Sequence, residues 1–95
     1  MSDDTLEWPD KDPDAVLDYF IDWQPKLDPV ADTIATSTWT LPAGITLHQQ
    51  GFSDTKTLIW LKNGTAGNTY AIHNRITTAG GRTFDQTVTI TVAEK

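Results

Sequence analysis

The chain has 95 residues, which is enough for one domain with a modest core and too few for two domains. It contains no cysteine, so disulfide bonds, thiolate metal sites and cysteine nucleophiles are excluded. The net charge is −6, but residues 1–14 carry six acids and one base. The remainder is therefore nearly neutral and offers no basic patch for nucleic acid.

Residues 1–14 are predicted to form a mobile or extended acidic arm in front of a folded domain at residues 15–95. The arm combines six acids and two prolines with two large apolar side chains, too few to offset the entropy lost on ordering. A purely solubilising tail has no need of an aromatic ring. We therefore interpret Leu6, Trp8 and Pro9 as an anchor that docks the arm on a partner protein.

Alternation of apolar and polar side chains predicts the first two strands. Residues 16–24 alternate in this way, and Pro25 ends the strand. The residues that follow are predicted to be a loop, and no helix is expected anywhere in the chain. Residues 33–41 form the second strand, with Ile34 and Trp39 on opposite faces.

The next two predicted strands differ in how apolar they are. Residues 45–50 form an ordinary third strand, followed by a break in which Phe52 is expected to turn into the core. Residues 55–62 form a fourth strand that is apolar on both faces, with Leu58 and Trp60 together on one of them. One small core cannot absorb both faces, so we expect Leu58 and Trp60 to contact a partner, either a second copy of the chain or another protein.

The last two predicted strands, within residues 69–92, form a hairpin around the turn Ala79-Gly80-Gly81. A loop of three residues that pairs Thr78 with Arg82 needs a left-handed residue at Gly81. The same register follows from the alternation, because a slip by one residue would break the apolar rows. It sets Ile76 opposite Phe84, Ile72 opposite Val88, Tyr70 opposite Ile90 and, on the other face, Arg75 opposite Asp85.

The connection into this hairpin is longer than a tight turn. Asn63 and Gly64 are followed by four more residues before the next strand, so we expect the chain to cross from one sheet to another here. Tyr70 comes just after the connection, as in the tyrosine corner of immunoglobulin-like sandwiches. Its hydroxyl is therefore expected to bond back to the connecting loop.

Together the strands predict an all-β fold, an immunoglobulin-like antiparallel β-sandwich of six to seven strands with an extended N-terminal arm. Sixteen threonines support this prediction, because β-branched side chains suit half-solvated strands. Trp23, Trp39 and Trp60 are interpreted as core residues. The alternative, that one or two of them form a docking or sugar-stacking surface, stays open.

The sequence lacks the residue patterns that are typical of catalysis and metal binding. His48 and His73 lie on separate strands, without the spacing of a zinc site. Asp18 and Asp22 share one strand face that we expect to be solvated. The acidic triplet that begins at Asp10 lacks the glycine and the glutamate of a calcium loop. We therefore expect no enzyme activity, no cofactor and no metal.

In order along residues 11–93, a succession of short segments resembles the fibre-tail adaptor proteins of tailed bacteriophages. The residues before Lys11 are not part of this resemblance. The segments are Lys11-Asp12-Pro13-Asp14, Leu17-Asp18-Tyr19, Ile21-Asp22-Trp23, Asp32-Thr33-Ile34, Ser37-Thr38-Trp39, Leu41-Pro42-Ala43-Gly44-Ile45, Gly64-Thr65-Ala66-Gly67, Ile76-Thr77-Thr78-Ala79-Gly80-Gly81-Arg82-Thr83 and Thr87-Val88-Thr89-Ile90.

The resemblance implies a non-enzymatic structural protein of the virion, an adaptor at the tail that links tail and fibre components. Its partners would be other virion proteins and further copies of itself. The charge pattern and the short apolar runs argue against nucleic acid and membrane as partners, and the acidic N-terminus predicts synthesis in the host cytoplasm. Two alternatives stay open: a capsid decoration protein, and a carbohydrate-binding module with exposed aromatic side chains.

Overall fold

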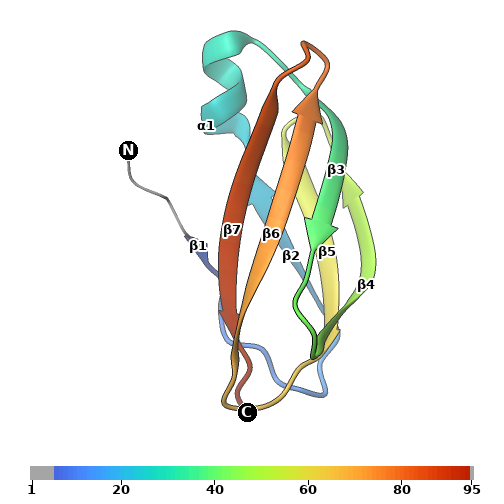
Figure 1. Cartoon of the computed structure of the whole chain (residues 1–95), viewed down its shortest axis with the longest axis vertical. Coiled ribbons are helices and arrows are strands. Elements are labelled where there is room, and N and C mark those ends of the chain that lie inside the picture. Colours follow the sequence, from blue (N-terminus) through green and yellow to red (C-terminus); the bar gives the residue numbers. More distant parts are fainter. Residues whose placement is uncertain (1–5, 95) are drawn as a thin grey trace.

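A computed structural model describes residues 6–94 as two β-sheets that form a sandwich (Figure 1). One sheet has four strands in the order β1-β7-β6-β3, and the other has three in the order β2-β5-β4. Every pair is antiparallel except β1 with β7. The predicted all-β sandwich is therefore confirmed. The strands are β1 (Leu6–Glu7), β2 (Leu17–Asp22), β3 (Ile34–Thr40), β4 (Ile45–Phe52), β5 (Lys56–Asn63), β6 (Thr69–Thr78) and β7 (Thr83–Thr91).

The hairpin of β6 and β7 has the predicted register. Ile76 lies opposite Phe84, Ile72 opposite Val88, Tyr70 opposite Ile90 and Arg75 opposite Asp85. The Thr78 N–H donates to the Arg82 carbonyl at 2.8 Å and closes the loop. Gly81 has a φ of 89°, the left-handed conformation that the loop requires. Period-two alternation and turn chemistry were enough to predict this element in full.

The connection from β5 to β6 passes from the three-stranded sheet to the four-stranded sheet, as predicted. The hydroxyl of Tyr70 accepts the backbone N–H of Thr65 at 2.9 Å, so the predicted tyrosine corner is present. Because this hydrogen bond stabilises the ionised phenol, it holds the pKa of Tyr70 below its usual value of 10.0.

A hydrogen-bonded polar group lies within the apolar core. The indole N–H of Trp23 donates to the Thr57 hydroxyl and to the Asn74 side-chain carbonyl, both at 3.1 Å. Asn74 in turn donates to the Ser37 hydroxyl and to the Thr38 carbonyl, both at 3.1 Å. Since Thr57 is on β5 and Asn74 is on β6, the group links the two sheets. Its members satisfy one another, which keeps the cost of burying them low.

The segment after β2 is helical, and the prediction of a loop there is wrong. Helix α1 (Gln24–Leu27) is followed by a 3₁₀ turn, η1 (Asp28–Val30). Pro25 lies in the first turn of α1, where its fixed φ and its missing N–H are tolerated. Leu27 is fully buried and ties the turn to the core. A helix of four residues is too short to leave a periodic pattern in the sequence.

Two predictions about strand faces are also wrong. Ile34 and Trp39 are both buried, because a β-bulge between Ile34 and Thr36 shifts the alternation along β3. Strand β4 continues to Phe52, and the Phe52 side chain is 48% exposed instead of lying in the core. A second bulge, between Leu47 and Gln49, changes the register of β4 before that point.

Residues 6–11 of the predicted arm are extended and lie against the sandwich. Strand β1 pairs with β7, and the backbone N–H of Trp8 donates to the Thr89 carbonyl at 2.9 Å. The Trp8 ring is 8% exposed and stacks on Tyr19 with 4.8 Å between ring centroids. Its indole N–H donates to the Phe20 carbonyl at 3.3 Å. One ring inserted between the sheets, with backbone pairing beside it, orders a segment that composition alone predicts to be free.

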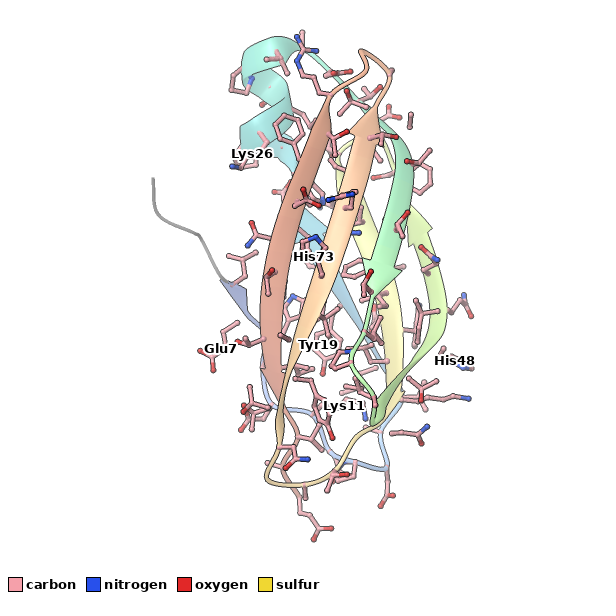
Figure 2. The ribbon with its side chains drawn as sticks, in the orientation of Figure 1. Glu7, Lys11, Tyr19, Lys26, His48 and His73 are labelled. Carbon is pink, nitrogen blue, oxygen red and sulfur yellow. The ribbon has the colours of Figure 1, made fainter. Side chains whose placement is uncertain are left out.

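Lys11 holds the same segment further along. Its side chain is fully buried, and Nζ donates to the carbonyls of Asp12 at 2.9 Å and Asn63 at 2.8 Å. Burial lowers the pKa of Lys11, and the nearby carboxylates of Asp12 and Asp14 partly oppose this shift. Figure 2 marks Lys11 near the end of the sandwich that holds the β5–β6 connection. Residues 1–5 lie outside the described residues, and a division of the chain at residue 14 stays a prediction.

Candidate interaction surface

The outer faces of the two sheets differ in chemistry. The four-stranded sheet presents a polar outer face, which we call the threonine face. Its central feature is a charged group in which Asp85 accepts from Arg75 Nε at 2.7 Å and lies 2.9 Å from His73 Nε2. The remaining outward side chains of β3, β6 and β7 are mostly threonines: Thr36, Thr38, Thr40, Thr69, Thr77, Thr83, Thr87, Thr89 and Thr91.

The charged group on the threonine face is a surface ion pair between Arg75 and Asp85. The Arg75 guanidinium beside Asp85, helped by His73, holds the pKa of that carboxyl below its usual value, and Asp85 raises the pKa of Arg75. Thr87 places its hydroxyl 3.3 Å from His73 Nδ1. Arg75 and Asp85 are exposed, where ion pairs contribute little to stability. The predicted Arg75–Asp85 pairing is confirmed.

The three-stranded sheet presents an apolar outer face. On β5, Ile59 and Leu61 are fully buried in the core, whereas Leu58 and Trp60 point outward and are half-buried. Phe20 on β2 lies opposite Leu58 and is 54% exposed. We call the group Phe20, Phe52, Leu58 and Trp60 the apolar face. Polar side chains surround it, since Asp18 lies opposite Trp60, Asp22 lies opposite Lys56, and Gln49 lies opposite Trp60 on the other side.

The apolar face contains a hollow with a volume of about 360 Å³. Lys56 is the cationic residue among its lining side chains, and Nζ of Lys56 lies 5.2 Å from the centroid of the Phe20 ring. This distance permits a cation–π contact that holds the ammonium at the rim. The hollow is lined by Phe20, Gly51, Phe52, Ser53, Lys56 and Leu58.

The five residues predicted to bind a partner occupy three different environments. Leu58 and Trp60 lie together on the apolar face. Leu6 and Pro9 are exposed at the edge of the four-stranded sheet. Figure 2 shows the side chain of Glu7, which follows Leu6 in the sequence, projecting outward from this edge. Trp8 is buried, so its ring is not available to a partner in this conformation, and its interpretation as an anchor for a partner stays a prediction.

Sequence reasoning did not include Phe20 or Phe52 among the partner-binding residues. Phe20 stands between Asp18 and Asp22 on the face of β2 that was predicted to be solvated, and an aromatic ring in that place was a usable signal. Phe52 pairs with the buried Thr57, so the ladder assigns it to the inner face, yet it is the last residue of the edge strand β4 and its side chain is exposed.

Residues 6–94 hold neither a cluster of metal-ligating side chains nor a membrane-spanning helix. Within that range no group of three or more His, Cys, Asp or Glu side chains converges as a metal site would require. None of the helices in the same range is long and apolar enough to span a membrane. His48 and His73 remain apart: Figure 2 shows His48 at the outer edge of β4 and His73 on β6.

The fold defines a small β-sandwich module whose two outer faces differ in chemistry. Residues 11–91 match the family described as podophage GP4 fiber-tail adaptor protein gp77. The match spans most of the 95 residues, so the chain belongs to this family. Comparison with curated proteins gave no match. Membership confirms the resemblance seen in the sequence and makes the protein a structural component of the phage virion.

Proposed function

We propose that this protein is a non-enzymatic adaptor at the phage tail, where it joins tail and fibre proteins through its apolar face. The observation that carries the proposal is the contrast between the two outer faces. Phe20 and Phe52 are each about half exposed on one face, whereas the other face is covered by threonines and paired charges. Exposed apolar groups with a polar rim are typical of protein-binding surfaces.

A second virion protein would cover the apolar face in the assembled tail. Leu58 and Trp60 would lie at the centre of this contact, with Phe20 beside them, and Leu6 and Pro9 would add a smaller contact at the sheet edge. Aromatic residues at the centre of an interface usually supply most of the affinity.

We also propose that the protein forms a homo-oligomer in the virion, that neither nucleic acid nor membrane is a partner, and that synthesis takes place in the host cytoplasm.

A capsid decoration protein is the closest alternative, since it would use an apolar face in the same way. A carbohydrate-binding module is less well supported. Sugars need several directed polar groups in addition to an aromatic platform, whereas Ser53 and Lys56 are the polar side chains that line the hollow.

The proposal is tested by locating the protein in virions. A phage that lacks the gene would be complemented with an epitope-tagged chain, and immunogold labelling would be compared with fibre attachment in the uncomplemented particles. We expect label at the tail, and tails without fibres when the protein is missing. Label over the capsid with fibres still attached would contradict the adaptor role and favour decoration.

A further inference from the structure

Gly51 has no role in the fold that requires glycine. Its φ does not lie in the left-handed region, unlike that of Gly81 in the hairpin turn. A Cβ built at Gly51 would meet no atom within 4 Å. Glycine inside a strand costs stability, because it gains no packing and loses more backbone entropy than other residues. A residue with a side chain would therefore suit the isolated protein better at this position.

The glycine does have an effect on the surface. Gly51 lies opposite Leu58, whose side chain points outward, and it lines the hollow between Phe20 and Phe52. A side chain at this position would occupy that space. Glycine in a strand often marks a point where another molecule approaches closely. The hollow is thus kept open at some cost to the strand.

The lining of the hollow selects for a particular occupant. Phe20, Phe52 and Leu58 provide apolar walls, and Lys56 provides a positive charge at the rim. Asp22 lies opposite Lys56 in the ladder, but its carboxylate accepts the Gln24 N–H at 3.0 Å. Among residues 6–94, Lys56 makes no ion pair. The ammonium can therefore meet a carboxylate from another molecule.

We propose that the hollow binds one aromatic or large aliphatic side chain of a different virion protein, next to a carboxylate that pairs with Lys56. This rests on the proposed adaptor function and specifies its partner. The apolar walls account for the inserted side chain, and the charge at the rim fixes its direction and excludes a cationic neighbour. The contact places one inserted group at the centre and one charge pair beside it, an arrangement in which the central group carries most of the affinity.

Two pairs of variants test the proposal in a phage that lacks its own copy of the gene. Gly51→Leu fills the hollow, and Thr38→Leu places the same side chain on the threonine face as a control. Lys56→Glu reverses the charge at the rim, and Lys62→Glu makes the same change on β5 away from the hollow. The readouts are the melting temperature of the purified full chain and its amount in purified virions.

We expect Gly51→Leu to keep or raise the melting temperature and yet to reduce incorporation into virions by about tenfold or more. Lys56→Glu should also reduce incorporation, by severalfold, since a buried like-charge contact replaces an attractive one. Thr38→Leu and Lys62→Glu should be incorporated as the wild type is. If Gly51→Leu fails to fold, the Lys56→Glu and Lys62→Glu pair alone decides the result.

A photoreactive amino acid at Ser53, on the rim, identifies the occupant in assembled virions, with one at Thr89 as control. The proposal requires that Ser53 be cross-linked to another virion protein, at an apolar residue with Asp or Glu beside it. Cross-links to a second copy of this chain, cross-links to a segment without that chemistry, or normal incorporation of both Gly51→Leu and Lys56→Glu would overturn it. Absence of the wild-type protein from tails would instead overturn the proposed function.

Discussion

At the scale of single residues, two tyrosines make a matched comparison. The Tyr70 hydroxyl accepts a backbone hydrogen bond, whereas the buried Tyr19 hydroxyl has no hydrogen-bond partner among the described residues. Tyr70→Phe should lower the free energy of unfolding by about 1 to 2 kcal/mol, because it leaves the Thr65 N–H without this acceptor. Tyr19→Phe should be neutral or stabilising, since it removes an unsatisfied polar group. Urea denaturation measures both, and a larger loss for Tyr19→Phe would contradict the assignment.

The inner and outer rows of the hairpin give a second prediction at this scale. Ile90 is fully buried, and its neighbour Thr89 faces outward on the threonine face. Ile90→Ala should cost about 2 to 4 kcal/mol of unfolding free energy, because it removes core contacts and leaves a cavity. Thr89→Ala should cost less than about 1 kcal/mol. Equal losses in chemical denaturation would show that the two faces are assigned the wrong way round.

At the scale of elements, a mobile N-terminal arm and the packed segment seen in the structure predict different effects of a mutation at Trp8. A mobile arm predicts that Trp8→Ala leaves stability unchanged. The structure places the Trp8 ring against Tyr19 and Trp39, so Trp8→Ala should cost about 3 kcal/mol. Leu6→Ala is the control from the same segment, because the Leu6 side chain is 42% exposed and should cost little. An unchanged melting temperature for Trp8→Ala would restore the mobile arm.

The turn between β6 and β7 gives a prediction about pH. Asp32 accepts hydrogen bonds from the Thr78 hydroxyl, the Thr33 N–H, the Arg82 guanidinium and the Gly80 N–H, which lower its pKa from 3.8 to about 2. Between about pH 4 and pH 2 the unfolded chain therefore binds more protons at this residue than the folded chain does. Stability should fall as the pH drops through this window.

Asp32→Asn tests the pH prediction, because asparagine does not titrate. The variant should lose less stability than the wild type between about pH 4 and pH 2, as followed by melting temperature against pH. Gly80→Ala tests the geometry of the same site, since a Cβ at Gly80 would lie 2.8 Å from both Asp32 Oδ2 and an Arg82 nitrogen. Parallel pH curves for the wild type and Asp32→Asn would show that the turn does not depend on this carboxylate.

The sequence predicted those elements in which a local rule operates without interruption. The hairpin of β6 and β7 follows from alternation and from one glycine with positive φ, and the tyrosine corner follows from the position of Tyr70. Prediction from the sequence failed where an irregularity interrupted such a local rule. The bulge in β3 brought Ile34 and Trp39 to the same face, Phe52 is exposed at the end of the edge strand β4, and the helix α1 is too short to have a period. The position of Trp8 depends on a gap between distant strands that no local pattern encodes.

At the scale of the whole molecule, the two outer faces of the sandwich differ: one is polar and the other is apolar. The candidate surface was only partly predictable: Leu58 and Trp60 came from the two-faced character of β5, whereas Phe20, Phe52 and Gly51 join them only in the folded chain. The threonine face can remain in water, because its charges are paired and its side chains are hydrophilic. Covering the other face in the virion would remove the apolar side chains from water, which favours assembly.

A cryo-electron microscopy map of the assembled tail, at a resolution that shows side chains, directly tests the claim that the apolar face is covered in the virion. It would show which outer face of the sandwich a neighbouring protein covers. We predict that Phe20, Leu58 and Trp60 are buried against another virion protein while the threonine face around His73 and Asp85 remains open to solvent. A map in which the threonine face is covered and Phe20, Leu58 and Trp60 face solvent would contradict the proposed mode of assembly.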